Sequence, residues 1–187
     1  RWPLRHHLDV LWWRLRHRHT HRTTLSRTHR TLFLLTAVVG LLACGGNSAP
    51  SGDGVVVSVA DGDTVEVRLN GRTENVRLIG VDTPETVHPT KPVGCYGPQA
   101  SAFTKQLLPP GTKVRLVRDA EARDYYNRLL AYVYRSSDNS FVNLELVRLG
   151  YGVPLNIEPN SAHRQEFVDA AFTAQQAQLG LWGACHG

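Results

Sequence analysis

The residues with the clearest catalytic potential lie near the end of the third strand that the sequence predicts. Four of them fall within nine residues of one another: Arg77, Asp82, Thr83 and Glu85. Asp63 begins the preceding strand, and neighbouring antiparallel strands bring such ends together. Two carboxylates and a nearby backbone carbonyl are oxygen ligands suited to Ca²⁺ or Mg²⁺, with positions left for water and a phosphate oxygen.

The same stretch supplies groups for hydrolysis. Glu85 follows the expected ligands by two residues, where it could accept a proton from an attacking water. Arg77 could bind the oxygens of the same phosphate as charge develops on them. Arg128, in Tyr126-Asn127-Arg128, offers a second guanidinium. Each residue alone fits an ordinary turn or strand end, but together they suit phosphodiester hydrolysis.

Short strands must position these groups. Hydrophobic residues alternate along residues 55–59 and 65–69, and a third strand is expected at Asn75–Val81. Asn70-Gly71 is a strong hairpin signal, because both residues tolerate positive φ. Lys113–Arg118 and Leu129–Arg135 are the expected fourth and fifth strands.

Three helices are expected around these strands. Gly97-Pro98 begins the first, which Pro109-Pro110-Gly111 ends. Phe141–Leu149 is a short second helix, and Ser161–Leu179 is a longer third one. Its Phe167, Ala171 and Phe172 are expected to face the core. The order of elements predicts a mixed α+β, mostly β fold: a five-stranded OB-type Greek-key barrel with three helices.

The excess of positive over negative charge lies at the N-terminal end of the chain. The 187 residues carry a formal net charge of +5. Residues 1–30 contain eight Arg and one acidic residue, whereas the rest has thirteen basic residues against fifteen acids. The expected globular part is therefore mildly acidic, and nucleic-acid binding there would need locally focused positive charge or a bound cation.

The N-terminal region is typical of an export signal. An uncharged run of thirteen residues, 31–43, is too short to span a bilayer and follows Arg27 and Arg30. Residues 25–44 are therefore expected to form a signal peptide. The run ends at Cys44 in a box like that of bacterial lipoproteins, so Cys44 is the expected lipidation site, with a soluble secreted form as the alternative.

The flanking regions complete the expected domain organisation. Residues 1–24 show no convincing period and are expected to be mistranslated upstream sequence or a disordered arm. A His/Arg-rich arm that binds metal or nucleic acid is the alternative. Residues 45–54 form an expected flexible linker, and residues 55–187 the folded domain.

Three cysteines are present, at positions 44, 95 and 185. If Cys44 is lipidated, Cys95 and Cys185 remain as a pair in an oxidising compartment, where disulfides persist. Two separate buried thiols are the alternative. The chain has no Cys-x-x-Cys motif, which gives little support to zinc binding or dithiol redox chemistry.

Four motifs in this order resemble the thermonuclease, or staphylococcal-nuclease-like, family. They are DGDTVEV, VRLIGVDTPET, HPTKPVGCYGPQASAFTKQLL and NRLLAYVY. The resemblance runs from about Val55 to Trp182. It implies an OB-fold, Ca²⁺-dependent endonuclease that cleaves DNA and RNA and leaves 3′-phosphates. We expect an exported or lipoprotein member of the family that is a monomer. Its contact with a membrane would be made only through lipid on Cys44, and no protein partner is implied.

The resemblance also implies roles for the candidate residues. Asp63, Asp82 and the Thr83 carbonyl would hold Ca²⁺. Glu85 would be the general base, and Arg77 and Arg128 would stabilise the transition state.

The sequence departs from the family pattern near the expected substrate. Two tyrosines of the family's type member correspond to Leu155 and Ile157 here, in a stretch one residue shorter, and a lysine corresponds to Tyr125. Tyr126 and Tyr96 remain as expected substrate-binding aromatic residues.

Two other functions compete with the nuclease. A barrel without catalysis that only binds nucleic acid should lack the glutamate or one arginine, yet Arg77, Glu85 and Arg128 are all present. A lipid-anchored structural or ion-binding envelope protein would show calcium-dependent stability without hydrolysis.

Overall fold

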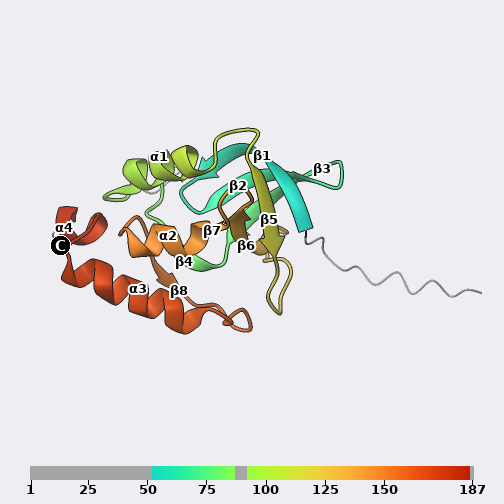
Figure 1. The fold of residues 1–187 in the computed structure, drawn as a ribbon. Helices are drawn as coiled ribbons and strands as arrows, with labels where there is room; N and C mark the ends of the chain where they lie inside the picture. The colour runs from blue at the N-terminus through green and yellow to red at the C-terminus, as the bar shows by residue number, and fades with distance from the viewer. Residues whose placement is uncertain (1–51, 87–91, 186–187) are drawn as a thin grey trace, which may run out of the picture. The chain divides into compact units, whose positions relative to one another are not determined.

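The computed structural model describes residues 52–86 and 92–185 (Figure 1). The expected arm at 1–24, the signal peptide at 25–44 with its Cys44, and the linker up to residue 51 lie outside the described residues. The elements, in chain order, are β1 Gly52–Asp61, β2 Thr64–Leu69, β3 Arg72–Leu78, β4 Gly80–Asp82, α1 Gly97–Leu107, β5 Lys113–Val117, β6 Leu129–Arg135, β7 Ser140–Phe141, α2 Val142–Arg148, β8 Val153–Leu155, α3 Arg164–Gln176 and α4 Leu181–Ala184.

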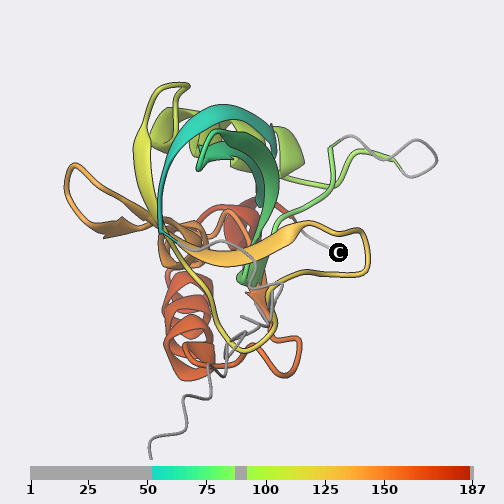
Figure 2. The same ribbon diagram turned by 90° about the vertical axis from the view of Figure 1, so that its right-hand side faces the viewer.

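Five strands close into a barrel, which confirms the predicted fold. They follow the order β3-β2-β1-β5-β6, and β3 also pairs in parallel with β6 (Figure 2). Alternate residues of each strand point inward and bury their side chains, as the period of two predicts. The barrel core contains Val56, Val65, Val67, Leu69, Val76, Leu78, Val114, Leu116, Leu129, Ala131 and Val133. The predicted hairpin is also present, with positive φ at Asn70 and Gly71.

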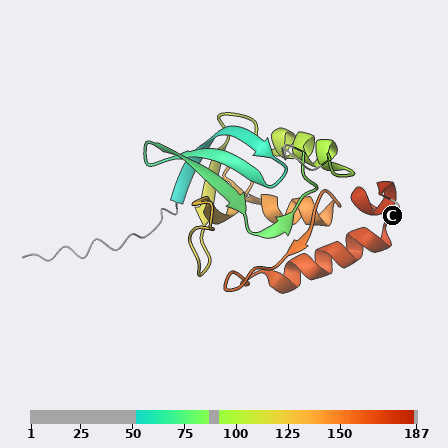
Figure 3. The ribbon, with the colours of Figure 1, turned by 180° about the vertical axis from the view of Figure 1, so that it is seen from behind.

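The first and third strands differ from their predicted bounds. Residues 52–54, assigned to the linker, belong to β1 and pair with β5. The third strand ends at Leu78, and the following β4 leaves the barrel to pair with β8 (Figure 3). The bend occurs at Gly80, whose φ is +84°, and a Cβ there would collide with the Phe167 ring. Only glycine fits this close approach of α3.

The three predicted helices are present, and the short helix α4 was not predicted. The third begins at Arg164, three residues later than predicted. Its buried stripe is Phe167, Ala171 and Ala174, with the spacing of one helix face. Phe172 directly follows Ala171 in sequence and therefore points away from that buried face. Its side chain is 63% exposed, so its predicted core position is wrong. The fourth helix and the strands β7 and β8 have four, two and three residues, too short to show a period.

A disulfide between Cys95 and Cys185 joins the segment before α1 to the end of α4. The two cysteines are 90 residues apart in sequence, so the bond closes most of the domain into one loop. Such a crosslink reduces the conformational entropy of the unfolded chain. Among the described residues, no helix combines the length and apolar character needed to cross a membrane.

Helix α2 is fixed to the barrel by a buried asparagine. Asn143 is fully buried between α2 and β6. Its Nδ2 donates to the carbonyl oxygens of Ile79 (2.8 Å) and Ala131 (3.0 Å). Its Oδ1 accepts the Val133 N–H at 2.9 Å. One side chain thus satisfies three backbone groups where β3 bends out of the barrel.

We predict that Asn143→Ala lowers the free energy of unfolding by about 2 kcal/mol or more. The Ile79 carbonyl and the Val133 N–H lose their partner, and buried polar groups without a partner cost about 1–3 kcal/mol each. The Ala131 carbonyl still accepts the Ile79 N–H. Urea denaturation measures the change. The matched control is Asn156→Ala, since Asn156 is exposed and its side chain bonds only Glu158 among the described residues. Equal stability of the two variants would contradict the role of Asn143.

Candidate active site

Asp63 is a buried carboxylate in the turn between β1 and β2. Its Oδ2 accepts hydrogen bonds from the backbone N–H (2.9 Å) and the hydroxyl (3.1 Å) of Thr83. Its Oδ1 accepts the Thr64 hydroxyl at 3.1 Å. These bonds join the β1–β2 turn to the end of β4, so the predicted approach of Asp63 to the segment at Asp82 is present.

Arg77 connects the two aspartates. Its Nη2 lies 3.2 Å from Asp63 Oδ2 and 2.9 Å from Asp82 Oδ1. Its Nη1 donates to the carbonyls of Leu78 and Val81, each at 2.7 Å. The guanidinium is thus fixed by four acceptors, and its Nε–H makes no hydrogen bond to another described residue.

Negative charge is concentrated beside this arginine. The side chain of Asp82 is 52% exposed. Burial raises the pKa of the Asp82 carboxyl, Arg77 lowers it, and the carboxylates of Asp63 and Glu85 raise it, with a net upward shift. Glu85 therefore lies close enough to Asp82 for the two charges to interact. A cation placed here would relieve this repulsion.

The segment that carries Thr83 and Glu85 is held by a residue that the sequence analysis did not select. The buried Asp61 accepts the Thr86 hydroxyl at 2.6 Å through Oδ1 and the Thr86 N–H at 3.3 Å through Oδ2. The Glu85 carbonyl accepts the Gly94 N–H at 2.8 Å. Asp61 and Asp63 thus fix the two ends of residues 83–86. The Asp-Gly-Asp spacing was the available signal, but it is also common in turns.

Arg128 approaches the site from the start of β6. Its Nε donates to Asp124 Oδ2 at 2.7 Å, and its backbone N–H donates to Asp124 Oδ1 at 2.9 Å. Its terminal nitrogens make no hydrogen bond to another described residue. The parallel pairing of β3 with β6 places Arg77 opposite Leu130, which brings the two arginines to one side of the barrel.

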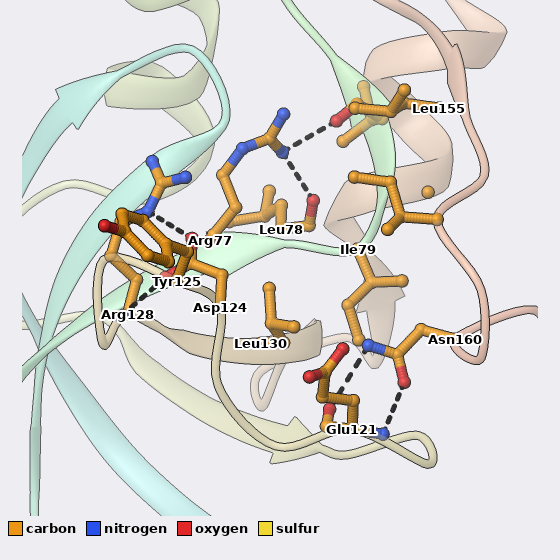
Figure 4. A pocket seen from close by; sticks show the side chains of 13 residues that line it. Arg77, Leu78, Ile79, Glu121, Asp124, Tyr125, Arg128, Leu130, Leu155 and Asn160 are labelled. Atoms are coloured by element: carbon orange, nitrogen blue, oxygen red, sulfur yellow. Dashed lines mark hydrogen bonds and ion pairs between the residues drawn. The ribbon is translucent and has the colours of Figure 1, made fainter.

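A cavity of about 290 Å³ lies beside the two arginines. Figure 4 shows Arg77 and Arg128 at one end and Glu121 and Asn160 at the other. Asn160 is buried and bonds the Glu121 backbone at both its N–H and its carbonyl, which closes that end. The walls between are mainly apolar, formed by Leu78, Ile79, Val81, Leu130, Leu155 and Ile157.

The aromatic candidates lie in different places. Tyr125 lines the cavity and is 96% exposed. Tyr126 is 75% exposed, and its ring contacts the Tyr125 ring edge to face. The Arg128 guanidinium lies 5.4 Å from the centre of the Tyr126 ring. Tyr96 does not line the cavity, because it precedes α1 and packs against Tyr151 at 5.5 Å between ring centres.

The arrangement suits a flat ring joined to a phosphate. The apolar walls and the exposed tyrosines offer surfaces for a base, and the two guanidinium groups offer donors for phosphate oxygens. Within residues 52–86 and 92–185, no three His, Cys, Asp or Glu side chains cluster in a way that could hold a metal by themselves. The metal site predicted from the sequence is of another kind, because it uses two carboxylates and the backbone carbonyl of Thr83.

Comparison with known proteins agrees with this geometry. Residues 75–184 match the family model described as staphylococcal nuclease homologue. The thermonuclease of Staphylococcus intermedius is 43% identical over 128 residues, 68% of this chain and 74% of its own length. The thermonuclease of Staphylococcus hyicus is 40% identical over 127 residues, 68% of this chain and 73% of its own length.

A longer relative is also similar. Endonuclease YhcR of Bacillus subtilis is 37% identical over 139 residues, 70% of this chain but 11% of its own length. The residues matched by the family model include Arg77 and Arg128, and the resemblance inferred from the four motifs is confirmed. The chain belongs to the staphylococcal nuclease homologue family.

Proposed function

We propose that the protein is a calcium-dependent endonuclease that hydrolyses DNA and RNA and leaves 3′-phosphates. Membership of the staphylococcal nuclease homologue family, with relatives named thermonuclease and endonuclease, makes it a nuclease. The observation that carries the rest is the position of Arg77. It contacts Asp63 and Asp82 and lines the cavity that also contains Arg128.

The proposed metal ligands are the carboxylates of Asp63 and Asp82 and the carbonyl of Thr83. All three are oxygen donors, which Ca²⁺ prefers, and Asp82 is open to solvent. Burial raises the pKa of Asp82 most, and the carboxylates of Asp63 and Glu85 raise it further; this group of carboxylates favours occupation by a cation. When bound, Ca²⁺ would supply positive charge that draws a phosphate into a pocket otherwise acidic.

Glu85 is the proposed general base. It takes a proton from a water whose oxygen forms a new bond to phosphorus. The bond from phosphorus to the 5′-oxygen breaks, the 5′-oxygen is protonated from solvent, and the phosphate remains on the 3′ side. Arg77, through its Nε–H, and Arg128, through its terminal nitrogens, bind the phosphate oxygens as their charge increases.

The proposed substrates are DNA and RNA strands whose bases are accessible. A base in the cavity contacts the apolar walls at Leu155 and Ile157, where stacking and apolar contact tolerate different sequences. Tyr126 is a proposed substrate-binding residue beside Arg128. Tyr96 is also a proposed substrate-binding residue, but it packs on Tyr151 and does not line the cavity, so its contact with a substrate would lie outside the cavity. We propose a monomer without a protein partner.

We also infer that the protein is exported. Residues 1–24 are then upstream sequence or an arm, residues 25–44 a signal peptide, and Cys44 a lipid attachment site or the start of a secreted form. The disulfide between Cys95 and Cys185 supports an oxidising compartment.

The first test is a digestion assay on single-stranded and double-stranded DNA and on RNA with Ca²⁺, with Mg²⁺ and with excess chelator. We expect cleavage with Ca²⁺, its loss in chelator, and products that carry 3′-phosphates. End-labelling before and after phosphatase treatment identifies these ends. Full activity in chelator would exclude the metal assignment, and binding without cleavage by folded protein would favour the nucleic-acid-binding alternative.

The second test is Glu85→Gln, which removes the proposed base with little change in size. We expect turnover to fall by about 10²-fold or more, the usual contribution of a general base. Glu166→Gln is the matched control, since Glu166 is exposed on the first turn of α3. A near-normal rate for Glu85→Gln would remove Glu85 from the mechanism.

The third test concerns export. We expect intact-mass spectrometry of the protein from its native cells to give a chain that begins at Cys44 and carries lipid, and Cys44→Ser to release it from the membrane fraction. A chain that keeps residues 25–43 would contradict the signal assignment. A processed chain without lipid would support the soluble secreted form.

A further inference from the structure

Three basic side chains gather on the outer surface of the barrel, outside the cavity described above. They are Arg68 on β2 and Lys113 and Arg115 on β5, here named the outer basic cluster. Val55 of β1 is directly opposite both Arg68 and Lys113, and Asp53 is opposite Arg115. Residues paired in this way point to the same side of a sheet. Because their neighbours in the strands are buried inward, the three basic side chains face outward.

The three side chains of the cluster form no ion pairs with carboxylates of the described residues. Arg68 and Lys113 make no ion pair or side-chain hydrogen bond among the described residues. Arg115 donates to Asn139 at 2.9 Å and lies 4.4 Å above the Tyr134 ring, neither of which neutralises its charge. By contrast, six other arginines form ion pairs with carboxylates: Arg77, Arg123, Arg128, Arg135, Arg148 and Arg164.

A hollow of about 550 Å³ runs between these side chains. Besides the three basic residues, it is lined by the polar Ser136 and Asn139, by Val55 and by a single acid, Asp53. Its lining therefore carries three positive charges and one negative charge in a domain that is acidic as a whole. Such a surface fits an extended polyanion.

The cluster shares a face with the catalytic residues. Thr64, Glu66 and Arg68 alternate along the outer side of β2, and Thr64 is directly opposite Arg77 on β3. At about 3.3 Å per residue, Arg68 is about 13 Å along β2 from Thr64. That distance corresponds to about four nucleotides of a duplex strand at 3.4 Å each. A chain bound at Arg77 can therefore reach the cluster.

We propose that the outer basic cluster is a second binding surface for the phosphate backbone of a nucleic acid engaged at the active site. The inference rests on the proposed nuclease function. An anionic membrane is the less suitable partner, because Val55, 36% exposed, is the only large hydrophobic residue among those that line the hollow. The cluster increases affinity for long substrates and leaves the chemistry of the bound phosphodiester unchanged.

The test uses the full chain with Arg68→Gln/Lys113→Gln. The matched control is Lys105→Gln/Arg148→Gln, which removes the same charge from α1 and α2. The basic residues 1–30 are present in every variant, so their contribution cancels in the comparison. Affinity for a long linear duplex is measured against salt concentration in chelator, and turnover is measured on a dinucleotide too short to reach the cluster.

We expect the slope of log Kobs against log salt concentration to fall in magnitude by about 1.8, because the variant neutralises two fewer phosphates. Turnover of the dinucleotide should stay unchanged, and the control variant should keep the original slope. Lys113→Gln alone should give about half the change, which keeps the test valid if the double variant unfolds. An equal loss of affinity in test and control variants would overturn the proposal, because it would show a general charge effect.

A vesicle arm distinguishes the other partner. Vesicles of phosphatidylserine and phosphatidylcholine are sedimented with each variant. If Arg68→Gln/Lys113→Gln loses vesicle binding while its DNA affinity and salt slope stay at the original values, the cluster is a membrane surface and the proposal is wrong. If the original chain does not cleave the dinucleotide with Ca²⁺ but binds the duplex through the cluster, the proposed nuclease activity fails and the surface remains.

Discussion

The candidate site depends on the ion pairs of Arg77 with Asp63 and Asp82. The arginine lies on β3, Asp63 lies in the turn before β2, and Asp82 ends β4, so three elements meet at one guanidinium. Two further bonds from Nη1 to backbone carbonyls hold the group in place. The side chain is therefore positioned before any substrate arrives, which is the condition for electrostatic stabilisation of a transition state.

That arrangement requires the chain to leave the barrel directly after β3. A continuous third strand would carry Asp82 farther along the sheet, away from Asp63. The bend at Gly80 redirects the chain instead, and Phe167 of α3 occupies the space where a side chain would lie. Asn143 satisfies the backbone groups that the bend exposes. The packing around the bend at Gly80 thus determines the positions of the Asp63 and Asp82 carboxylates.

Charge is distributed differently at the active site and at the outer basic cluster. Around the active site, arginines and acids are paired, so the pocket can accept a cation and a phosphate together. On the outer face, Arg68 and Lys113 have no carboxylate partners among the described residues. An acidic domain can therefore bind a polyanion through local fields, even though its net charge opposes it.

Although β4, β7 and β8 were missed, the amino-acid sequence predicted the five barrel strands, the hairpin at Asn70-Gly71, the barrel and the catalytic candidates. These features depend on local periodicity, turn chemistry and motif spacing, which a linear chain displays directly. The folded structure was needed to see the exposure of Phe172, the support of Thr86 by Asp61, the position of Tyr96 outside the cavity lining and the cavity itself. The cavity joins residues 77–81, 121–130 and 155–160, and such long-range packing leaves no periodic signal in the sequence.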